Sequence, residues 1–157
     1  MNQRMAFWVL GLFLASMVGC KPIDIYEKNE SIPNFKWNTN FRPSFQFNIT
    51  DTTAQYQLFA VLRHNESYRY NNIWLQVGTE TPGDSVRLQR VDIMLGSDDQ
   101  GWRGSSMGDI WELREPLTPG PFKFKKPGTY RFTLTQIMRE NPLEGMLSAG
   151  IRLERVP

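Results

Sequence analysis

The amino-acid sequence predicts an all-β fold, an antiparallel β-sandwich of about seven to nine strands that is either immunoglobulin-like or a jelly-roll. Three observations support this prediction. Short segments alternate apolar and polar residues with the period of two that is typical of half-buried strands. Turn signals separate these segments about every 8–12 residues. Helical periodicity is almost absent after residue 20, so a fold built from helices is not expected.

The first 20 residues resemble a bacterial lipoprotein signal peptide with its cleavage box. Arg4 precedes an apolar run over residues 5–18, and the small residue Gly19 directly precedes Cys20, the only cysteine. The run is shorter than the about 20 residues that cross a bilayer, and its length is typical of a signal peptide. Cys20 is therefore the predicted lipidation site. The alternatives are an uncleaved anchor and an ordinary signal peptide that happens to be followed by a cysteine.

The sequence predicts three parts. Residues 1–19 form the lipoprotein signal peptide, residues 20–43 the lipidated N-terminus with an irregular segment, and residues 44–157 the β-sandwich domain. An edge strand is expected at residues 23–27. We expect the irregular segment to lie against the domain, because its three aromatic side chains would otherwise face water. These aromatic residues are Phe35, Trp37 and Phe41.

The first strands of the sandwich are predicted before residue 78. Apolar and polar residues alternate over residues 44–50 and again over residues 73–77, which predicts two half-buried strands. Asp51-Thr52-Thr53 is typical of a turn. Residues 55–62 carry apolar side chains at both parities, as expected for a central strand. The residues expected to face inward are Phe45, Phe47, Ile49, Ile73, Leu75 and Val77.

A long strand is predicted over residues 85–95, after a turn region that contains Pro82-Gly83. Val86 and Leu88 share one parity of this strand, whereas its last three apolar residues share the other. Because one face of a strand packs on the core, we expect a β-bulge near Gln89-Arg90 that brings both sets inside.

The second half of the chain predicts a Gly-rich loop over residues 96–109 and a short helical turn at residues 141–144. The helical turn is indicated by a capping residue followed by proline. Tyr130 follows Gly128-Thr129 at a strand start, as in the tyrosine corner of immunoglobulin-like folds, and the alternative is an ordinary core aromatic. The strands are expected at residues 110–113, 129–137 and 149–155.

Five segments follow one another in an order and spacing that resemble a known family. They are Arg63-His64 and residues 68–75, 101–110, 128–132 and 150–154. Together with the cleavage box, they resemble the GldH-type gliding-motility lipoproteins over nearly the whole mature chain. The resemblance implies a cell-envelope lipoprotein required for the gliding machinery and linked to type IX secretion. It also implies other gliding or secretion proteins of the envelope as partners, in a family not known for enzymatic activity.

The composition gives no argument for nucleic-acid binding, a cofactor or a disulfide. The formal net charge is +2, and removal of Arg4 leaves +1. His64 is the only histidine, and we expect it at a strand end as a surface or hydrogen-bonding residue. No serine lies in a Gly-x-Ser-x-Gly turn. We therefore expect no enzymatic activity, and an envelope hydrolase that uses two carboxylates is the weaker alternative.

The Gly-rich loop is the expected interaction site, since exposed aromatic side chains there would mark a partner or sugar site. The alternative is that its tryptophans fold back and plug one end of the sandwich. The alternative function is a carbohydrate-binding or nutrient-capture lipoprotein, which would present two or three coplanar aromatic side chains on one face. The loop residues concerned are Trp102, Arg103, Met107, Asp109 and Trp111.

Two weaker predictions concern calcium and glycosylation. Carboxylates bracket the Gly-rich loop, and clustered carboxylates are ligands that calcium prefers, although residues 98–101 are also typical of a simple turn. The calcium candidates are Asp98, Asp99 and Asp109, and no other metal site is expected. Thr52 and Ser85 each follow an aspartate in motifs that resemble O-glycosylation sites of bacteria with this machinery.

The residues after Cys20 predict the side of the membrane on which the protein lies. Lys21-Pro22-Ile23 follows, with only Asp24 as an acidic residue, whereas surface-exported lipoproteins of related bacteria tend to carry acidic residues there. We therefore expect a protein attached to the membrane through lipidated Cys20 and facing the periplasm.

Overall fold

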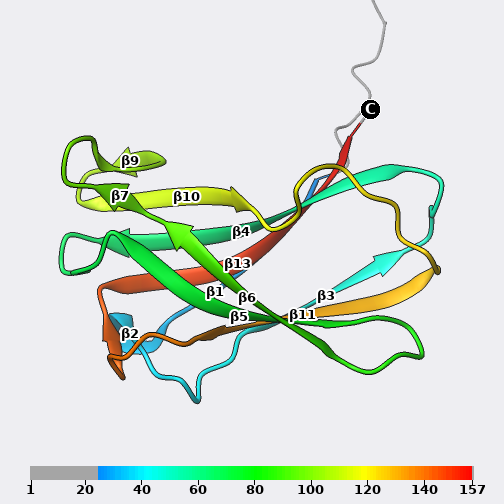
Figure 1. The fold of residues 1–157 in the computed structure, drawn as a ribbon, viewed down its shortest axis with the longest axis horizontal. Helices are drawn as coiled ribbons and strands as arrows, with labels where there is room; N and C mark the ends of the chain where they lie inside the picture. The colour runs from blue at the N-terminus through cyan, green and yellow to red at the C-terminus, as the bar shows by residue number, and fades with distance from the viewer. Residues whose placement is uncertain (1–24, 157) are drawn as a thin grey trace, which may run out of the picture.

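The computed structural model describes residues 25–156, which form two antiparallel sheets packed around one core (Figure 1). Cys20 and the predicted signal peptide lie outside these residues. The first sheet has the strand order β1 (Ile25–Ser31), β13 (Met146–Val156), β4 (Gln55–Asn65), β10 (Ile110–Pro116) and β9 (Ser105–Met107). The second sheet has the order β3 (Ser44–Ile49), β11 (Gly128–Gln136), β5 (Asn72–Glu80) and β6 (Arg87–Met94).

Four strands of two residues complete the described structure. β2 (Lys36–Trp37) pairs with β12 (Leu143–Glu144), and β7 (Gly96–Ser97) pairs with β8 (Gly101–Trp102). Within residues 25–156, eight strands are six residues or longer, and the only helical segment is the 3-10 turn η1 (Pro33–Phe35). No helix in this range is long and apolar enough to cross a membrane. The predicted all-β sandwich is confirmed.

The core lies between the sheets and is filled by the residues that alternation predicted. In β3, exposed and buried residues alternate along the whole strand. β4 pairs with β13 on one side and β10 on the other, as expected for a central strand. The burial of these apolar side chains is the main favourable contribution to folding. The inward-facing residues include Phe45, Phe47, Ile49, Ile73, Leu75, Val77, Phe132, Leu134, Ile151 and Leu153.

The chain joins the sandwich well before residue 44. β1 pairs with β13 over its whole length, from Ile25 opposite Glu154 to Ser31 opposite Ser148. It contains residues 25–27 of the edge strand expected at residues 23–27, whose first two residues lie outside the described range, and it continues to Ser31. Tyr26 contacts Phe47 of the other sheet edge-on, with ring centroids 4.8 Å apart. This contact closes the β1 side of the sandwich.

The segment after β1 packs against the domain, as the aromatic residues indicated, with one exception. Trp37 is completely buried, and its Nε1 donates a hydrogen bond to the Phe41 carbonyl oxygen over 2.9 Å. Phe35 remains 53% exposed, so the expectation that all three aromatics leave the solvent is wrong for this residue. Phe35 lies in η1 with a φ of 56°, and that turn directs its ring outward.

The predicted β-bulge near Gln89-Arg90 is wrong. β5 and β6 pair in one continuous register, from Asn72 opposite Met94 to Thr79 opposite Arg87. Val86 and Leu88 therefore lie on the outer face and are 55% and 66% exposed. The inward positions of this part of β6 hold polar residues instead, because β6 keeps the parity of Ile93.

The predicted helical turn at residues 141–144 is also wrong. The Asn141–Pro142 peptide bond is cis, and Leu143 and Glu144 form β12. Leu143 is 1% exposed and lies opposite Trp37. The backbone hydrogen-bonding groups of this segment are therefore paired with β2 and not within a helical turn.

The Gly-rich segment 96–109 is ordered into β7, β8 and β9. Two of its glycines are required by close approach. A Cβ at Gly96 would lie 2.7 Å from the Gly101 carbonyl oxygen, and a Cβ at Gly104 would lie 2.1 Å from the Glu112 carbonyl oxygen. Gly104 also has a φ of 96°, which side chains of other residues rarely allow.

Candidate functional site

The long strands run between two ends of the sandwich, and these ends differ in structure (Figure 1). The end with β7, β8 and β9 is called the loop end. The opposite end, on the right in Figure 1, is called the cleft end, and it contains the turns at residues 51–53 and 81–85 and the segment 117–127. The described chain both begins and ends at the cleft end, since Ile25 lies opposite Glu154 near the end of β13.

The loop end is closed by an aromatic cluster around His64. The imidazole contacts Trp102 edge-on at a centroid distance of 4.4 Å and stacks on Trp111 at 5.9 Å with an interplanar angle of 15°. Tyr68 lies 5.6 Å away on another side of the ring. These rings come from β4, β8, β10 and the connection after β4. Their packing seals the end of the core.

His64 is fully buried, so the surface position is wrong, whereas the alternative of a hydrogen-bonding residue agrees with its Nδ1, which lies 3.3 Å from the Asn65 carbonyl oxygen. The residue has the inward parity of β4, and the pairing of this strand continues to Asn65. Burial lowers the pKa of His64 below its ordinary value, because a charged imidazole loses hydration there. Its Nε2 has no hydrogen-bond partner among the described residues. A neutral imidazole in this position acts as a packing residue.

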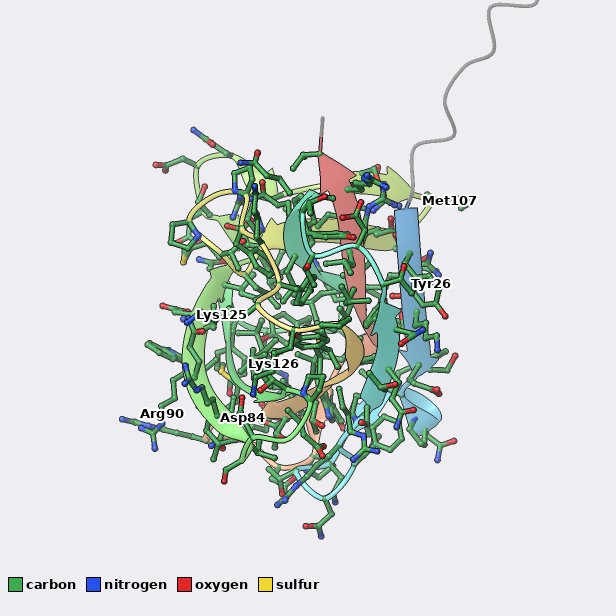
Figure 2. All side chains as sticks on the ribbon, turned by 90° about the vertical axis from the view of Figure 1, so that its right-hand side faces the viewer. Tyr26, Asp84, Arg90, Met107, Lys125 and Lys126 are labelled. Carbon is green, nitrogen blue, oxygen red and sulfur yellow. The ribbon has the colours of Figure 1, made fainter. Side chains whose placement is uncertain are left out.

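The predicted loop residues do not converge on one site. Trp102 and Trp111 are both partly buried in the cluster described above, which is the plug arrangement. Arg103 donates a hydrogen bond to the Met94 carbonyl oxygen and pairs with Glu115 at 3.0 Å. Met107 is 83% exposed and projects from the edge of the molecule (Figure 2). Asp109 is also exposed.

The calcium and glycosylation candidates occupy separate turns. Within the described part of the chain, no group of three or more His, Cys, Asp or Glu side chains could hold a metal ion. Asp98 accepts a hydrogen bond from the Asn71 side chain over 2.9 Å. Thr52 is half-buried in the Asp51 turn, and Ser85 is exposed in the turn before β6. Both glycosylation candidates lie at the cleft end.

The cleft end contains a cavity of about 490 Å³ between the two sheets, beside β6. Its floor is apolar and comes from both sheets and the segment 117–126. Its main floor residues are Leu58, Val77, Val91, Leu117, Phe124 and Phe132. The Tyr130 hydroxyl donates a hydrogen bond to the Lys126 carbonyl oxygen over 2.8 Å, which fixes the end of this segment as in a tyrosine corner.

The rim of this cleft is basic. Arg87 comes from the start of β6, and Lys123, Lys125 and Lys126 come from the segment opposite. Lys126 pairs with Asp84 at 3.5 Å. A hydrogen bond from Thr81 and the charge of Lys126 lower the pKa of Asp84. The charge of Arg87 also lowers the pKa of Asp84, whereas among residues 25–156 Lys123 and Lys125 make no ion pair.

The outer face of the first sheet has the opposite character, because its charges are paired. Arg114 pairs with Glu112 at 2.8 Å and with Glu27 at 3.6 Å, and Arg152 pairs with Glu27 at 2.8 Å. Burial alone would raise the pKa of Glu27, but hydrogen bonds from Arg152 and Asn29 and the charge of Arg114 lower it overall. The charges of this network are therefore balanced within the protein.

Sequence reasoning missed the cleft. One available signal was the alternation of Phe122 and Phe124 with Lys123 and Lys125, which places apolar residues inside and cations at the rim. The other was the parity change in β6. A parity change of this kind is compatible with a β-bulge, but it is equally compatible with a regular strand whose inward positions lack apolar side chains.

The fold and the site together define a class of protein, an antiparallel β-sandwich domain with one sealed end and one open, basic-rimmed end. The family follows from comparison with known proteins. Residues 24–153 match the model of the GldH lipoprotein family, and the chain belongs to this family. The predicted resemblance is confirmed. Membership in a lipoprotein family also implies association with a membrane of the cell envelope.

Two relatives cover almost the whole chain. The gliding motility lipoprotein GldH homolog of Christiangramia forsetii is 28% identical over 163 aligned residues, with 98% of each chain covered. The gliding motility lipoprotein GldH of Flavobacterium johnsoniae is 28% identical over 153 aligned residues, with 92% of this chain and 94% of the relative covered. No solved structure matches the chain significantly.

Proposed function

We propose that this protein is a non-catalytic structural or assembly component of the bacterial gliding-motility machinery, linked to type IX secretion. The observation that supports this role is the family match over residues 24–153, together with two gliding-motility relatives aligned over nearly their whole length. Its direct partners in this proposal are other gliding or secretion proteins of the envelope.

The protein is attached to the membrane through a lipid on Cys20 and faces the periplasm. Ile25 begins β1 only five residues after Cys20, and five extended residues span at most about 18 Å. The lipid would therefore hold the sandwich close to the membrane surface. Two or three acyl chains make such attachment stable, whereas one chain gives only marginal binding.

A non-catalytic role is supported by the surroundings of the residues with catalytic potential. His64, the only histidine, is sealed among aromatic rings with a lowered pKa. The carboxylates Glu27 and Glu112 are held by arginines in the network on the outer face. Neither arrangement leaves a general base open to a substrate.

Carbohydrate binding is the less favoured function. A sugar platform needs several exposed, coplanar aromatic rings. Trp74 is 42% exposed, whereas Trp37 is completely buried and the tryptophans of the loop end pack around His64. This distribution favours the structural role over the sugar-binding role.

Crosslinking in intact envelopes, followed by affinity purification and mass spectrometry, tests the proposed role. We expect gliding or secretion proteins to be recovered with the tagged full-length protein, and Cys20→Ala to lose both labelled palmitate and these partners. Recovery of saccharide-utilisation proteins instead would support the alternative. Protease treatment of intact cells should leave the protein uncut if it faces the periplasm.

A further inference from the structure

We infer that the cleft binds an acidic phospholipid of the membrane that holds Cys20, with an acyl chain on the apolar floor and the phosphate at Arg87, Lys123 and Lys125. This inference rests on the proposed attachment through Cys20. It adds a second, noncovalent contact with the membrane, which would fix the orientation of the sandwich.

The position of the cleft relative to the chain start supports this occupant. Ile25 lies at the cleft end, and Cys20 is five residues before it. A chain of that length keeps the cleft end, rather than the loop end, within about 18 Å of the lipid headgroups. β1 and β6 lie on opposite sides of this end, so the membrane surface would have to extend across it to reach the cleft (Figure 2). Membrane lipid is therefore the most concentrated apolar ligand near the cleft once Cys20 is anchored.

The floor of the cleft suits an acyl chain. Leu58, Val77 and Phe132 form an apolar surface between the sheets, and the volume of about 490 Å³ lies within the range of about 300–1,000 Å³ typical of ligand sites. Arg87 and Gln89 have the same parity in β6 as the buried Ile93, but both are exposed, so over this part of the floor β6 contributes polar side chains and only Val91 as an apolar one. A small hydrophilic anion would leave the floor uncovered.

The charges at the rim suit an anionic headgroup. Three carboxylates near this end are already paired, Asp84 with Lys126, Asp51 with Arg155 and Glu80 with Arg131. Lys123 and Lys125 make no ion pair within the described residues, and Arg87 interacts with Asp84 only through its charge, so these cations are available to a phosphate. Figure 2 shows Lys125 and Lys126 at this end, with Arg90 pointing away from it.

Two further features fit a lipid. Val86 and Leu88 are exposed beside the basic rim, and apolar side chains next to cations are typical of surfaces that lie in a membrane interface. The Thr118 hydroxyl lines the cleft and is buried without a hydrogen-bond partner among residues 25–156.

Photo-crosslinking of the purified full-length lipoprotein in uncharged detergent tests the inference. The probes are phosphatidylglycerol, phosphatidylethanolamine and oleic acid, each with the same photoreactive group on an acyl chain. We expect phosphatidylglycerol to label β6 and the segment 117–126 at least fivefold more than phosphatidylethanolamine. The double variant K123Q/K125Q should reduce this labelling about tenfold. The matched control R90Q/R139Q removes equal charge outside the cleft and should leave it unchanged.

Equal labelling by the two phospholipids, labelling by oleic acid alone, or full labelling of folded K123Q/K125Q would overturn the inference. Val91→Phe provides a second variant that narrows the cleft without removing charge, and it should reduce labelling at an unchanged melting temperature. Palmitate incorporation into the same samples separates the two proposals. Palmitate on Cys20 without phosphatidylglycerol labelling would refute the cleft alone, and specific labelling without palmitate would refute the anchor alone.

Discussion

The two ends of the sandwich are built from the same strands but are closed in different ways. At the loop end, β4 places His64 inward and Trp102 and Trp111 cover it. At the cleft end, the core-facing parity of β6 is occupied by Arg87 and Gln89, which remain exposed, and a cavity lies beside them. An alternating strand thus fixes which side chains face the core, and their size and polarity decide whether the space is filled.

Removal of an aromatic ring from the sealed end should have the largest effect on stability. We expect Trp102→Ala to lower the free energy of unfolding by about 3 kcal/mol, because the ring packs on both the core and His64. Val91→Ala at the open end should cost only about 1 kcal/mol, since its side chain already borders a cavity. Denaturant unfolding of both variants measures the difference. Equal losses would mean that the two ends are packed alike.

The open end has its own structural support in Tyr130. We expect Tyr130→Phe to lower the free energy of unfolding by about 1.5 kcal/mol, because the Lys126 carbonyl oxygen loses its hydrogen bond from the hydroxyl. Hydrogen exchange should increase over residues 117–127 and stay unchanged at the loop end. Increased exchange around His64 would contradict the separation of the two ends.

The sealed end should make stability depend on pH. The ordinary pKa of His64 is 6.5 and burial lowers it in the folded protein, so below about pH 6.5 the unfolded chain binds a proton that the folded protein does not. Stability should therefore fall with decreasing pH, by at most about 1.4 kcal/mol per pH unit, until the folded pKa is reached. Between pH 6.5 and 5.5 we expect a measurable loss that does not exceed about 1 kcal/mol.

Unfolding measured at both pH values, for the wild type and for His64→Phe, tests this dependence. Phenylalanine keeps an aromatic ring in the cluster but cannot titrate, so this variant should lose no stability over the same interval. Asp51 and Glu27, whose pKa values are also lowered, titrate below their ordinary values of 3.8 and 4.5 and do not interfere. The same slope in the variant would assign the effect to another group.

The sequence predicts strands with strong alternation better than strands in which the alternation changes parity. Strong alternation, as in Phe45, Phe47 and Ile49, predicted both strand and inward face, because burial of one face determines the register. The prediction of a bulge failed because β6 is an edge strand and tolerates exposed Val86 and Leu88. The assumption that every apolar residue of a strand faces the core was therefore wrong for β6, and it is the reason why the cleft was not predicted.

Other misses came from contacts between residues far apart in the chain. A cap followed by proline predicted a helical turn at residues 141–144, but pairing with β2, about a hundred residues earlier, determines that segment. The burial of His64 could not be predicted, because the rings that cover its imidazole belong to Trp102 of β8 and Trp111 of β10, which are distant in the sequence. The candidate site depends on the same kind of contact, since its floor combines both sheets and its rim combines β6 with the segment 117–126.

The smallest expected change in stability comes from the rim of the open end. Asp84→Asn removes the partner of Lys126, and both side chains are more than half exposed, so we expect no measurable change in the free energy of unfolding. Lys126 and Arg87 then both lose the negative charge of Asp84, and labelling by photoreactive phosphatidylglycerol should rise about threefold. Glu80→Gln, which frees Arg131 outside the cleft, is the matched control and should leave labelling unchanged. Asp84→Asn is expected to change labelling without changing stability, so a change in labelling cannot be attributed to unfolding. Reduced labelling of this variant would therefore argue against a phosphate at this rim.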